Sequence, residues 1–195
     1  MSGHDADIAT ILAFWFTTPD DPQWQTMRAA WWDKDAAFDR SCREAGMDLH
    51  ARALRGDLEP WKEHPDGALA YVVLCDQLPR NMFRGTPQMY ASDHLALAGA
   101  KLIDRQGWRS GMTPVQRLFS HMPFEHAENV PDQEAHVAFV RDEYDGPEKD
   151  DCLQSAERHL EIVSRFGRFP HRNAILGRQT TPEEAAFLKE PNSSF

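Results

Sequence analysis

Apolar residues recur with the period of an α-helix along most of this chain, and this pattern decides its fold class. Between Ile8 and Trp15, apolar side chains occupy positions i, i+3, i+4 and i+7, and a second stripe of this kind runs from Val115 to Met122. No segment shows the apolar–polar alternation of a half-buried strand, and no Asn-Gly pair marks a hairpin. We therefore predict an all-α fold.

Three Thr-Pro pairs indicate where helices begin, at Thr86, Thr113 and Thr181. Threonine supplies a side-chain oxygen for the N-cap, and proline suits the first helical turn, where its missing N–H costs nothing. Thr113 and Thr181 are each followed three residues later by a Gln or Glu, which is the spacing of a capping box. The sequence therefore predicts that all three threonines are N-caps.

Further helices are predicted from the same periodicity and from Gly, Pro and Asp as boundary residues. They cover 24–55 with an interruption near Gly46, Asp66 to about Gln77, 131–144 and 149–166, with a short turn at 171–176. Asp145-Gly146-Pro147 is the strongest break, but apolar stripes continue on both sides of it. We expect one all-helical domain spanning 1–195, with about eight to ten helices.

Charge and composition exclude several function classes. The net charge of −10 argues against general nucleic-acid binding, which needs a broad basic surface. The longest strongly apolar run, Ala68 to Cys75, is far too short to span a membrane. The three cysteines show no CxxC pairing, which favours a reducing compartment, and we expect a cytoplasmic protein. No nucleotide-binding loop of the GxxxxGK[ST] or GxGxxG type occurs, and we expect no cofactor.

Several side chains near the middle of the chain are of types that can bind a metal ion. His121, Glu125, His126 and Glu128 carry groups that bind zinc or iron. However, Pro123 is expected to interrupt the helix between them, and neither a His-Glu-x-x-His nor a paired Glu-x-x-His pattern occurs. We therefore expect no metal.

Basic residues are concentrated in two windows without any Asp or Glu. The first window runs from Gln77 to Ser92, and the second lies between Glu161 and Glu183. The surfaces of acidic proteins usually intersperse the two signs of charge, so these windows predict either a binding site or a buried ion network. We expect the two windows to meet in one polar cavity, with Asp76, Glu125 and Glu128 as the internal carboxylates.

Asp76 directly follows the apolar run and is expected at the C-terminal end of a buried helix. A buried carboxylate there opposes the helix dipole and requires a cation. Arg80 or Arg84 can supply that cation. One interpretation is a structural Asp–Arg clamp that locks a sharp turn at Pro79. The other is an acid or ligand-orienting group in a pocket.

Three long motifs resemble a known, largely bacterial family. The segments Leu74–Pro87, Met122–Glu128 and Arg165–Arg178 look like those of the domain-of-unknown-function family 924, and the resemblance extends over nearly the whole chain. It implies an all-helical fold similar to that of tetratricopeptide-repeat proteins, and it implies no particular activity. Relatives have a motif closer to Pro-Phe-Met-His-Ser-Glu, whereas Glu125 and Ala127 replace the Met and Ser here.

Three functional classes remain open, and the sequence does not decide whether the protein is an enzyme or what its oligomeric state is. The first is a binding module that holds a small anion or a carboxylate-bearing peptide end, mainly through arginine forks. The second is a hydrolase-like enzyme that uses His126 or His171 as acid and base, oriented by Glu128 or Asp76. The third is a purely structural Arg–carboxylate network. The candidate ligand-binding residues are Asp76, Arg80, Asn81, Arg84, His126, Glu128, Arg165, Arg168, His171, Arg172 and Asn173, and the main anion contacts are expected from Arg168, His171 and Arg172.

Overall fold

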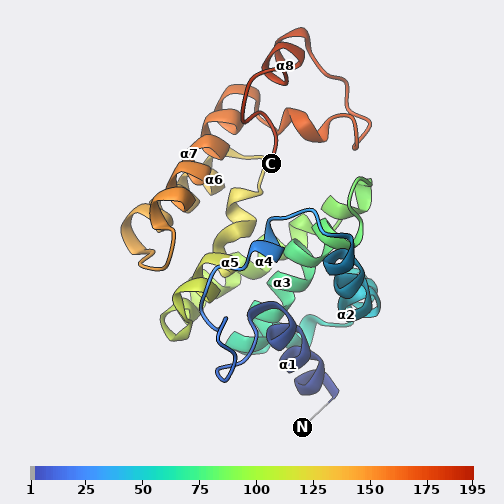
Figure 1. The fold of residues 1–195 in the computed structure, drawn as a ribbon, viewed down its shortest axis with the longest axis vertical. Coiled ribbons are helices and arrows are strands. Elements are labelled where there is room, and N and C mark those ends of the chain that lie inside the picture. The colour runs from blue at the N-terminus through green and yellow to red at the C-terminus, as the bar shows by residue number, and fades with distance from the viewer. Residues whose placement is uncertain (1–2) are drawn as a thin grey trace.

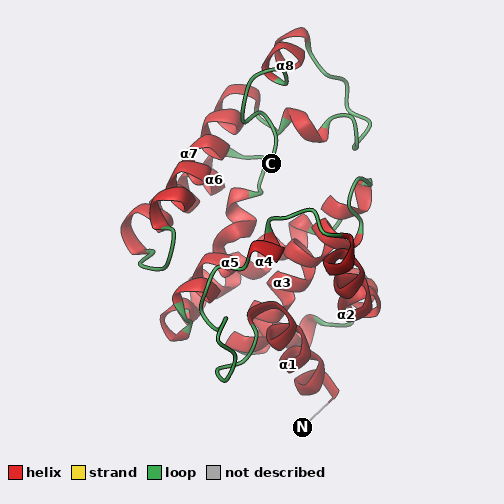
Figure 2. Cartoon of the chain, in the orientation of Figure 1, coloured by secondary structure: helices red, strands yellow, loops and turns green. Residues whose placement is uncertain are grey.

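The helix α3, Pro65–Met82, passes through the middle of the structure, and every side chain from Gly67 to Pro79 along it is buried. Helices α1, α2, α4 and α5 all pack against α3. A helix that is apolar nearly all round is stable only in such surroundings. The arrangement comes from a computed structural model that describes residues 3–195, and the described chain consists of helices and loops without a strand (Figure 2).

The described residues form one all-helical domain with eight α-helices, which confirms the predicted fold class. The remaining α-helices are α1 (Gly3–Phe16), α2 (Ala36–Leu54), α4 (Asp93–Gln106), α5 (Pro114–Glu125), α6 (Val130–Ala138), α7 (Lys149–Phe166) and α8 (Pro182–Phe187). The 3₁₀ turns are η1 (Ala29–Trp31), η2 (Glu59–Glu63), η3 (Pro87–Tyr90), η4 (Trp108–Gly111) and η6 (Pro170–Arg172), and η5 (Phe139–Glu143) is a π-helical turn. The similarity to tetratricopeptide-repeat folds is compatible with this architecture and stays a prediction.

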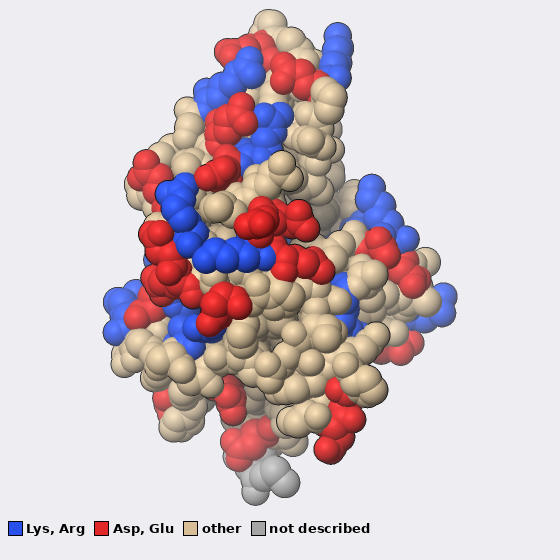
Figure 3. All heavy atoms as spheres, turned by 60° about the vertical axis from the view of Figure 1, so that its left-hand side comes forward, with Lys and Arg blue, Asp and Glu red and all other residues tan. Residues whose placement is uncertain are grey.

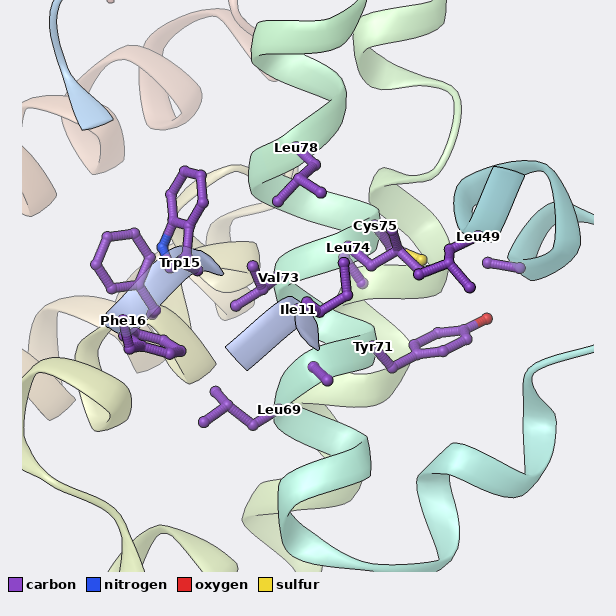
Figure 4. Close-up of a cluster of buried hydrophobic side chains, with 14 of the residues drawn as sticks. Ile11, Trp15, Phe16, Leu49, Leu69, Tyr71, Val73, Leu74, Cys75 and Leu78 are labelled. Atoms are coloured by element: carbon purple, nitrogen blue, oxygen red, sulfur yellow. The ribbon is translucent and has the colours of Figure 1, made fainter. Parts of the chain in front are cut away.

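The main hydrophobic core lies where α1 and α2 cover α3 (Figure 4). Ile11 and Trp15 of α1 are fully buried against Leu74 and Leu78 of α3. Trp31 of η1 stacks on Trp15 with ring centroids 5.7 Å apart, which holds the loop after α1 against the core. Each such side chain contributes about 1.5–3 kcal/mol through burial, so this core is the main source of stability around α3.

A second part of the domain, made of α7, η6 and α8, lies above this core in Figure 1. Helix α6 connects it to α5, because α6 packs against both α5 and α7. Ile162 and Val163 of α7, Phe169 and Phe187 form a separate apolar cluster in this part. The chain end returns between the two parts in the view of Figure 1. Within the described residues, no helix is both long and apolar enough to cross a membrane.

Helix α3 does not end before Pro79, and this corrects the predicted turn. Proline has no N–H to donate to the carbonyl of Cys75, four residues earlier. Ser92 replaces that donor, because its Oγ lies 2.7 Å from the Cys75 carbonyl oxygen, and His50 Nε2 lies 2.9 Å from Ser92 Oγ. The helix therefore continues to Met82, and Asp76 lies inside it rather than at its end.

Other predicted boundaries also differ from the structure. The segment predicted as one helix over 24–55 forms a helix only from Ala36, where Asp35 accepts hydrogen bonds as the N-cap. That helix is uninterrupted at Gly46, where a Cβ would lie 2.5 Å from Leu78 Cδ2, so glycine serves close packing between α2 and α3. The N-cap of α3 is His64 and not Asp66. Pro123 does not end α5, whereas the turn predicted at 171–176 is present, as η6 followed by turn residues over 173–177.

Two of the three predicted threonine caps are confirmed with complete capping boxes. The hydroxyl oxygens of Thr113 and Thr181 accept from the backbone N–H of Gln116 and Glu184, whose side chains accept from the threonine N–H in return. Thr86 occupies the N-cap position of η3, but its side chain makes no capping bond. Its hydroxyl donates to the Phe83 carbonyl instead.

This difference predicts unequal costs for the same substitution. Thr113→Ala and Thr181→Ala should each lower the free energy of unfolding by about 1 kcal/mol, because each leaves a helix N-terminus without its acceptor. Thr86→Ala should stay within about 0.5 kcal/mol, since no cap is lost. Urea denaturation followed by circular dichroism measures all three. An equal cost at Thr86 would contradict the assignment of caps.

Candidate functional site

A cavity of about 410 Å³ lies where the end of α3, η3 and α5 meet α7 and η6. The cavity is lined by polar side chains on most of these elements and by the aromatic rings of Trp31, Trp32, Tyr90 and Phe195. The predicted site residues that line it are Arg80, Asn81, Arg84, His126, His171 and Arg172. The structure thus brings residues of both acid-free windows to one cavity.

Asp76 lies behind the cavity wall as a fully buried carboxylate. Its Oδ1 is 2.7 Å from His126 Nδ1 and 3.2 Å from an Arg80 guanidinium nitrogen, and Gln77 Nε2 donates to Oδ2 at 2.5 Å. Burial alone would raise the pKa of Asp76, but Arg80 and His126 outweigh it and hold that pKa below its usual range. The predicted pairing of Asp76 with an arginine of its own motif is therefore present. The same carboxylate orients His126, which lines the cavity.

Asp93 joins the two windows, because Arg80 and Arg172 share its carboxylate. Arg80 donates to both oxygens of Asp93 at 3.0 and 3.3 Å, and Arg172 donates to Oδ2 at 3.3 Å. The Arg172 guanidinium also lies between two rings, 4.6 Å from the centroid of Tyr90 and 4.5 Å from that of Phe169. Packing and one shared carboxylate therefore hold Arg172 in place.

The Nε atom of Arg172 is buried and has no hydrogen-bond partner among the described residues. Only 6% of this residue is exposed. Burial lowers the pKa of Arg172, and the neighbouring Arg80 lowers it further. A buried donor on a charged group costs free energy when it is left unpaired. Arg172 is thus a cavity residue with unused capacity to bind an acceptor.

Arg84 also lines the cavity, and a bidentate ion pair occupies its guanidinium. Its Nε and a terminal nitrogen donate to the two carboxylate oxygens of Asp39 at 2.9 and 2.8 Å, and it also donates to the side-chain oxygen of Asn81. This bidentate pair anchors the end of α3 to the start of α2. We assign Arg84 and Asn81 to the cavity wall.

Glu125 lies in the cavity wall beside histidines and a serine. Ser155 donates to Glu125 Oε1 at 2.9 Å, His159 Nδ1 is 3.2 Å from the same oxygen, and His136 Nε2 is 3.5 Å from Oε2. Burial raises the pKa of Glu125, but its interactions with His159, His136 and His126 lower it more, so the net shift is downward. The carboxyl group is therefore ionised at neutral pH.

Burial lowers the pKa of two histidines that line the cavity, His171 and His159. Burial, followed by the charge of Arg172, lowers the pKa of His171 to about 3. The Nδ1 atom of His171 is buried without a partner in the described part of the chain. Burial also lowers the pKa of His159, whose ring stacks on Phe195 with centroids 3.7 Å apart.

Several predicted site residues lie outside this cavity. Arg168 pairs with Glu184 at 2.6 Å, and Arg165 pairs with Glu183 at the surface. Glu128 accepts from both terminal nitrogens of Arg178 and from the backbone N–H of Phe169. Asn173 is fully buried, where it donates to Glu184. These ion pairs and hydrogen bonds thus hold the segment that contains η6 and α8 in place, as the structural interpretation expected.

Sequence reasoning missed three residues of the site, Tyr90, Asp93 and Ser155. Asp93 directly follows the first acid-free window, so its position at the edge of that window was an available signal. Tyr90 and Ser155 have no motif around them, and only the fold brings them to the cavity. Among the described residues, no group of three or more His, Cys, Asp or Glu side chains is arranged to hold a metal ion.

Comparison with known proteins identifies the family. Residues 11–192 match the bacterial proteins of unknown function called DUF924. The chain belongs to this family. Its fold is similar to that of a protein of unknown function, ATU0120 from Agrobacterium tumefaciens, with 40% sequence identity and a TM-score of 0.81, over 95% of this chain and 98% of the other. No curated protein matches the chain. This match confirms the family that the three sequence motifs predicted.

The buried position of Asp76 in this DUF924 protein leads to a stability prediction. Asp76→Ala should lower the free energy of unfolding by about 3–5 kcal/mol, because Arg80 and His126 lose their shared partner inside the protein. Glu183→Ala is the control, since it removes an exposed carboxylate partner of Arg165 and should cost at most about 1 kcal/mol. Thermal and urea unfolding measure both. An unchanged melting temperature for Asp76→Ala would contradict the buried pair.

Proposed function

We propose that the cavity binds a small molecule or peptide end through a carboxylate or phosphate group at Arg172. The observation that carries this proposal is the unpartnered, buried Nε of Arg172 in the cavity wall. A guanidinium offers its donors as a planar fork, and carboxylate and phosphate match that fork with two oxygens. The bound anion would accept the hydrogen bond that Nε of Arg172 can donate.

The sharing of Asp93 supports the same proposal. Arg80 and Arg172 together face Asp93 and Asp76, and Asp76 also serves His126 and Gln77. One more acceptor near Arg172 would therefore add interactions without displacing existing ones. Arg84 is not expected to contribute, because Asp39 already occupies its fork.

The surface charge agrees with a local site rather than a broad binding face. On the face shown in Figure 3, acidic and basic side chains are interspersed and form no extended basic patch. Polyanions such as nucleic acids need such a patch, whereas one small anion responds to the nearby field of a single cavity. A cytoplasmic location is part of this proposal and is supported by the free thiols of Cys42, Cys75 and Cys152.

Arg172→Gln tests the anion site. Phosphate or a short carboxylate at about one hundred times its Kd should stabilise the wild-type protein by about 2.7 kcal/mol, which corresponds to a rise in Tm of roughly 5–10 °C for a protein of this size. Arg172→Gln should abolish the rise, measured from the anion-free Tm of the variant itself. Chloride at equal ionic strength separates specific binding from general salt effects.

Arg165→Gln is the matched control for this experiment. Arg165 belongs to the same acid-free window, but it is exposed, pairs with Glu183 and does not line the cavity. It should therefore retain the full anion-dependent rise. Equal rises in both variants would exclude Arg172 as the anion-binding residue.

A second candidate function, acid–base catalysis, is favoured by the contact between Asp76 and His126. A carboxylate on Nδ1 fixes the tautomer and orientation of an imidazole, so that Nε2 can accept or donate a proton. His126 lines the cavity, and Arg172 there could stabilise negative charge that develops on a bound substrate. The proposal is a hydrolase-like reaction with His126 as the acid and base. His171 is disfavoured in this role, because its pKa of about 3 makes it a weak base.

His126→Gln tests the catalytic proposal. Simple carboxylic esters, amides and phosphate esters are offered as substrates, and any turnover by the wild-type protein should fall by about a hundredfold or more in the variant. His94→Gln is the control, because His94 is exposed on α4 and does not line this cavity. Turnover that survives in His126→Gln would remove His126 from the mechanism, and no turnover of any class would leave binding alone.

A further inference from the structure

Glu125 differs from the other carboxylates around the cavity in its partners. Asp39 pairs with Arg84, while Asp76 and Asp93 pair with Arg80. The ion-pair partners of Glu125 in the described part of the chain are the imidazoles of His136 and His159, and no Lys or Arg is among them. Glu125 is also the acidic side chain among the residues that line this cavity.

This arrangement leaves the negative charge of the Glu125 carboxylate without a Lys or Arg partner in the described part of the chain. Only 6% of the residue is exposed, and a buried ionised carboxyl group is costly unless a cation is close. Burial lowers the pKa of both His136 and His159, to about 3 for His136, so both rings are neutral at pH 7. Ser155 contributes one neutral hydrogen bond. The wall of the cavity therefore retains a negative charge without a permanent cation beside it.

Glu125 lines two neighbouring cavities. A neighbouring cavity of about 250 Å³ shares Trp32, Met122, Glu125 and Ser155 with the polar cavity. The walls of this neighbouring cavity also include the apolar side chains of Met27, Leu118 and Cys152. Glu125 thus lies at the junction between a polar cavity, which contains Arg172, and a more apolar one.

We propose that the ligand is an amino-carboxylate, whose protonated amino group binds Glu125 while its carboxylate binds Arg172. The inference rests on the proposed anion site and names the class of molecule that fills it. A protonated amine supplies the missing cation and up to three N–H donors, which Glu125 can accept because an ionised carboxylate only accepts. The remaining, apolar part of the molecule occupies the neighbouring cavity. The two opposite charges of such a ligand match the unpaired donor of Arg172 and the Glu125 carboxylate.

Four probes of the same carbon chain length test this inference. Hexanoate offers a carboxylate alone, hexylamine an amine alone, and 2-aminohexanoate and 6-aminohexanoate offer both groups at two separations. Isothermal titration calorimetry measures the Kd of each probe for the wild-type protein, Glu125→Gln and Glu148→Gln. Glu148 also lines the neighbouring cavity but is exposed, so it is the matched control.

We expect at least one amino-carboxylate to bind the wild-type protein about tenfold or more tightly than hexanoate, the advantage typical of a hydrogen bond to a charged group. Glu125→Gln should remove that advantage and leave hexanoate binding unchanged, whereas Glu148→Gln should retain it. If both amino-carboxylates bind no more tightly than hexanoate, the inference is overturned while the anion site stands. If hexanoate and phosphate both fail to bind, the proposed anion site itself is wrong. If Glu125→Gln does not fold, the ratio of the hexanoate Kd to the amino-carboxylate Kd for the wild-type protein decides the question.

Discussion

The structure depends on one buried carboxylate in the middle of its central helix. Asp76 is fully buried in α3, where an unpaired charge would be unstable. Arg80 from the next turn and His126 from the end of α5 both bind it. Neutralising this charge therefore ties α3 to α5 and points two polar side chains at the same cavity. The requirement that stabilises the helix pair also builds the candidate site.

Most charged groups around the cavity are joined by ion pairs, and two groups are not fully paired. Arg80 links Asp76 to Asp93, and Asp93 links α4 to Arg172 on η6. In this series of ion pairs, each charged side chain has a partner of opposite charge, which is how proteins tolerate buried ions. The two groups that are not fully paired are one donor of Arg172 and the carboxylate of Glu125. Both residues line the cavity, so a ligand there would meet an unpaired donor and a carboxylate without a Lys or Arg partner among the described residues.

The sequence-based predictions fail where the deciding partner is distant along the chain. Proline inside a helix removes a backbone donor, so the sequence predicts a turn at Pro79. Ser92, distant in sequence, supplies the missing hydrogen bond to Cys75, and no pattern within α3 could reveal that. Arg168 and Arg172 share one acid-free window, yet Arg168 turns to Glu184 while Arg172 lines the cavity. Composition placed both in a polar region, and only the direction of each side chain separates them.

Local patterns in the chain were enough to establish the all-α class, the N-caps at Thr113 and Thr181, and the need of Asp76 for a cation. These features depend on residues within one or two helical turns, where backbone geometry is nearly constant. The tertiary structure decided that Asp93 joins Arg80 to Arg172, that His126 faces Asp76, and that Glu125 has no Lys or Arg partner in the described chain. These pairings connect distant segments, and the packing of side chains in three dimensions selects them.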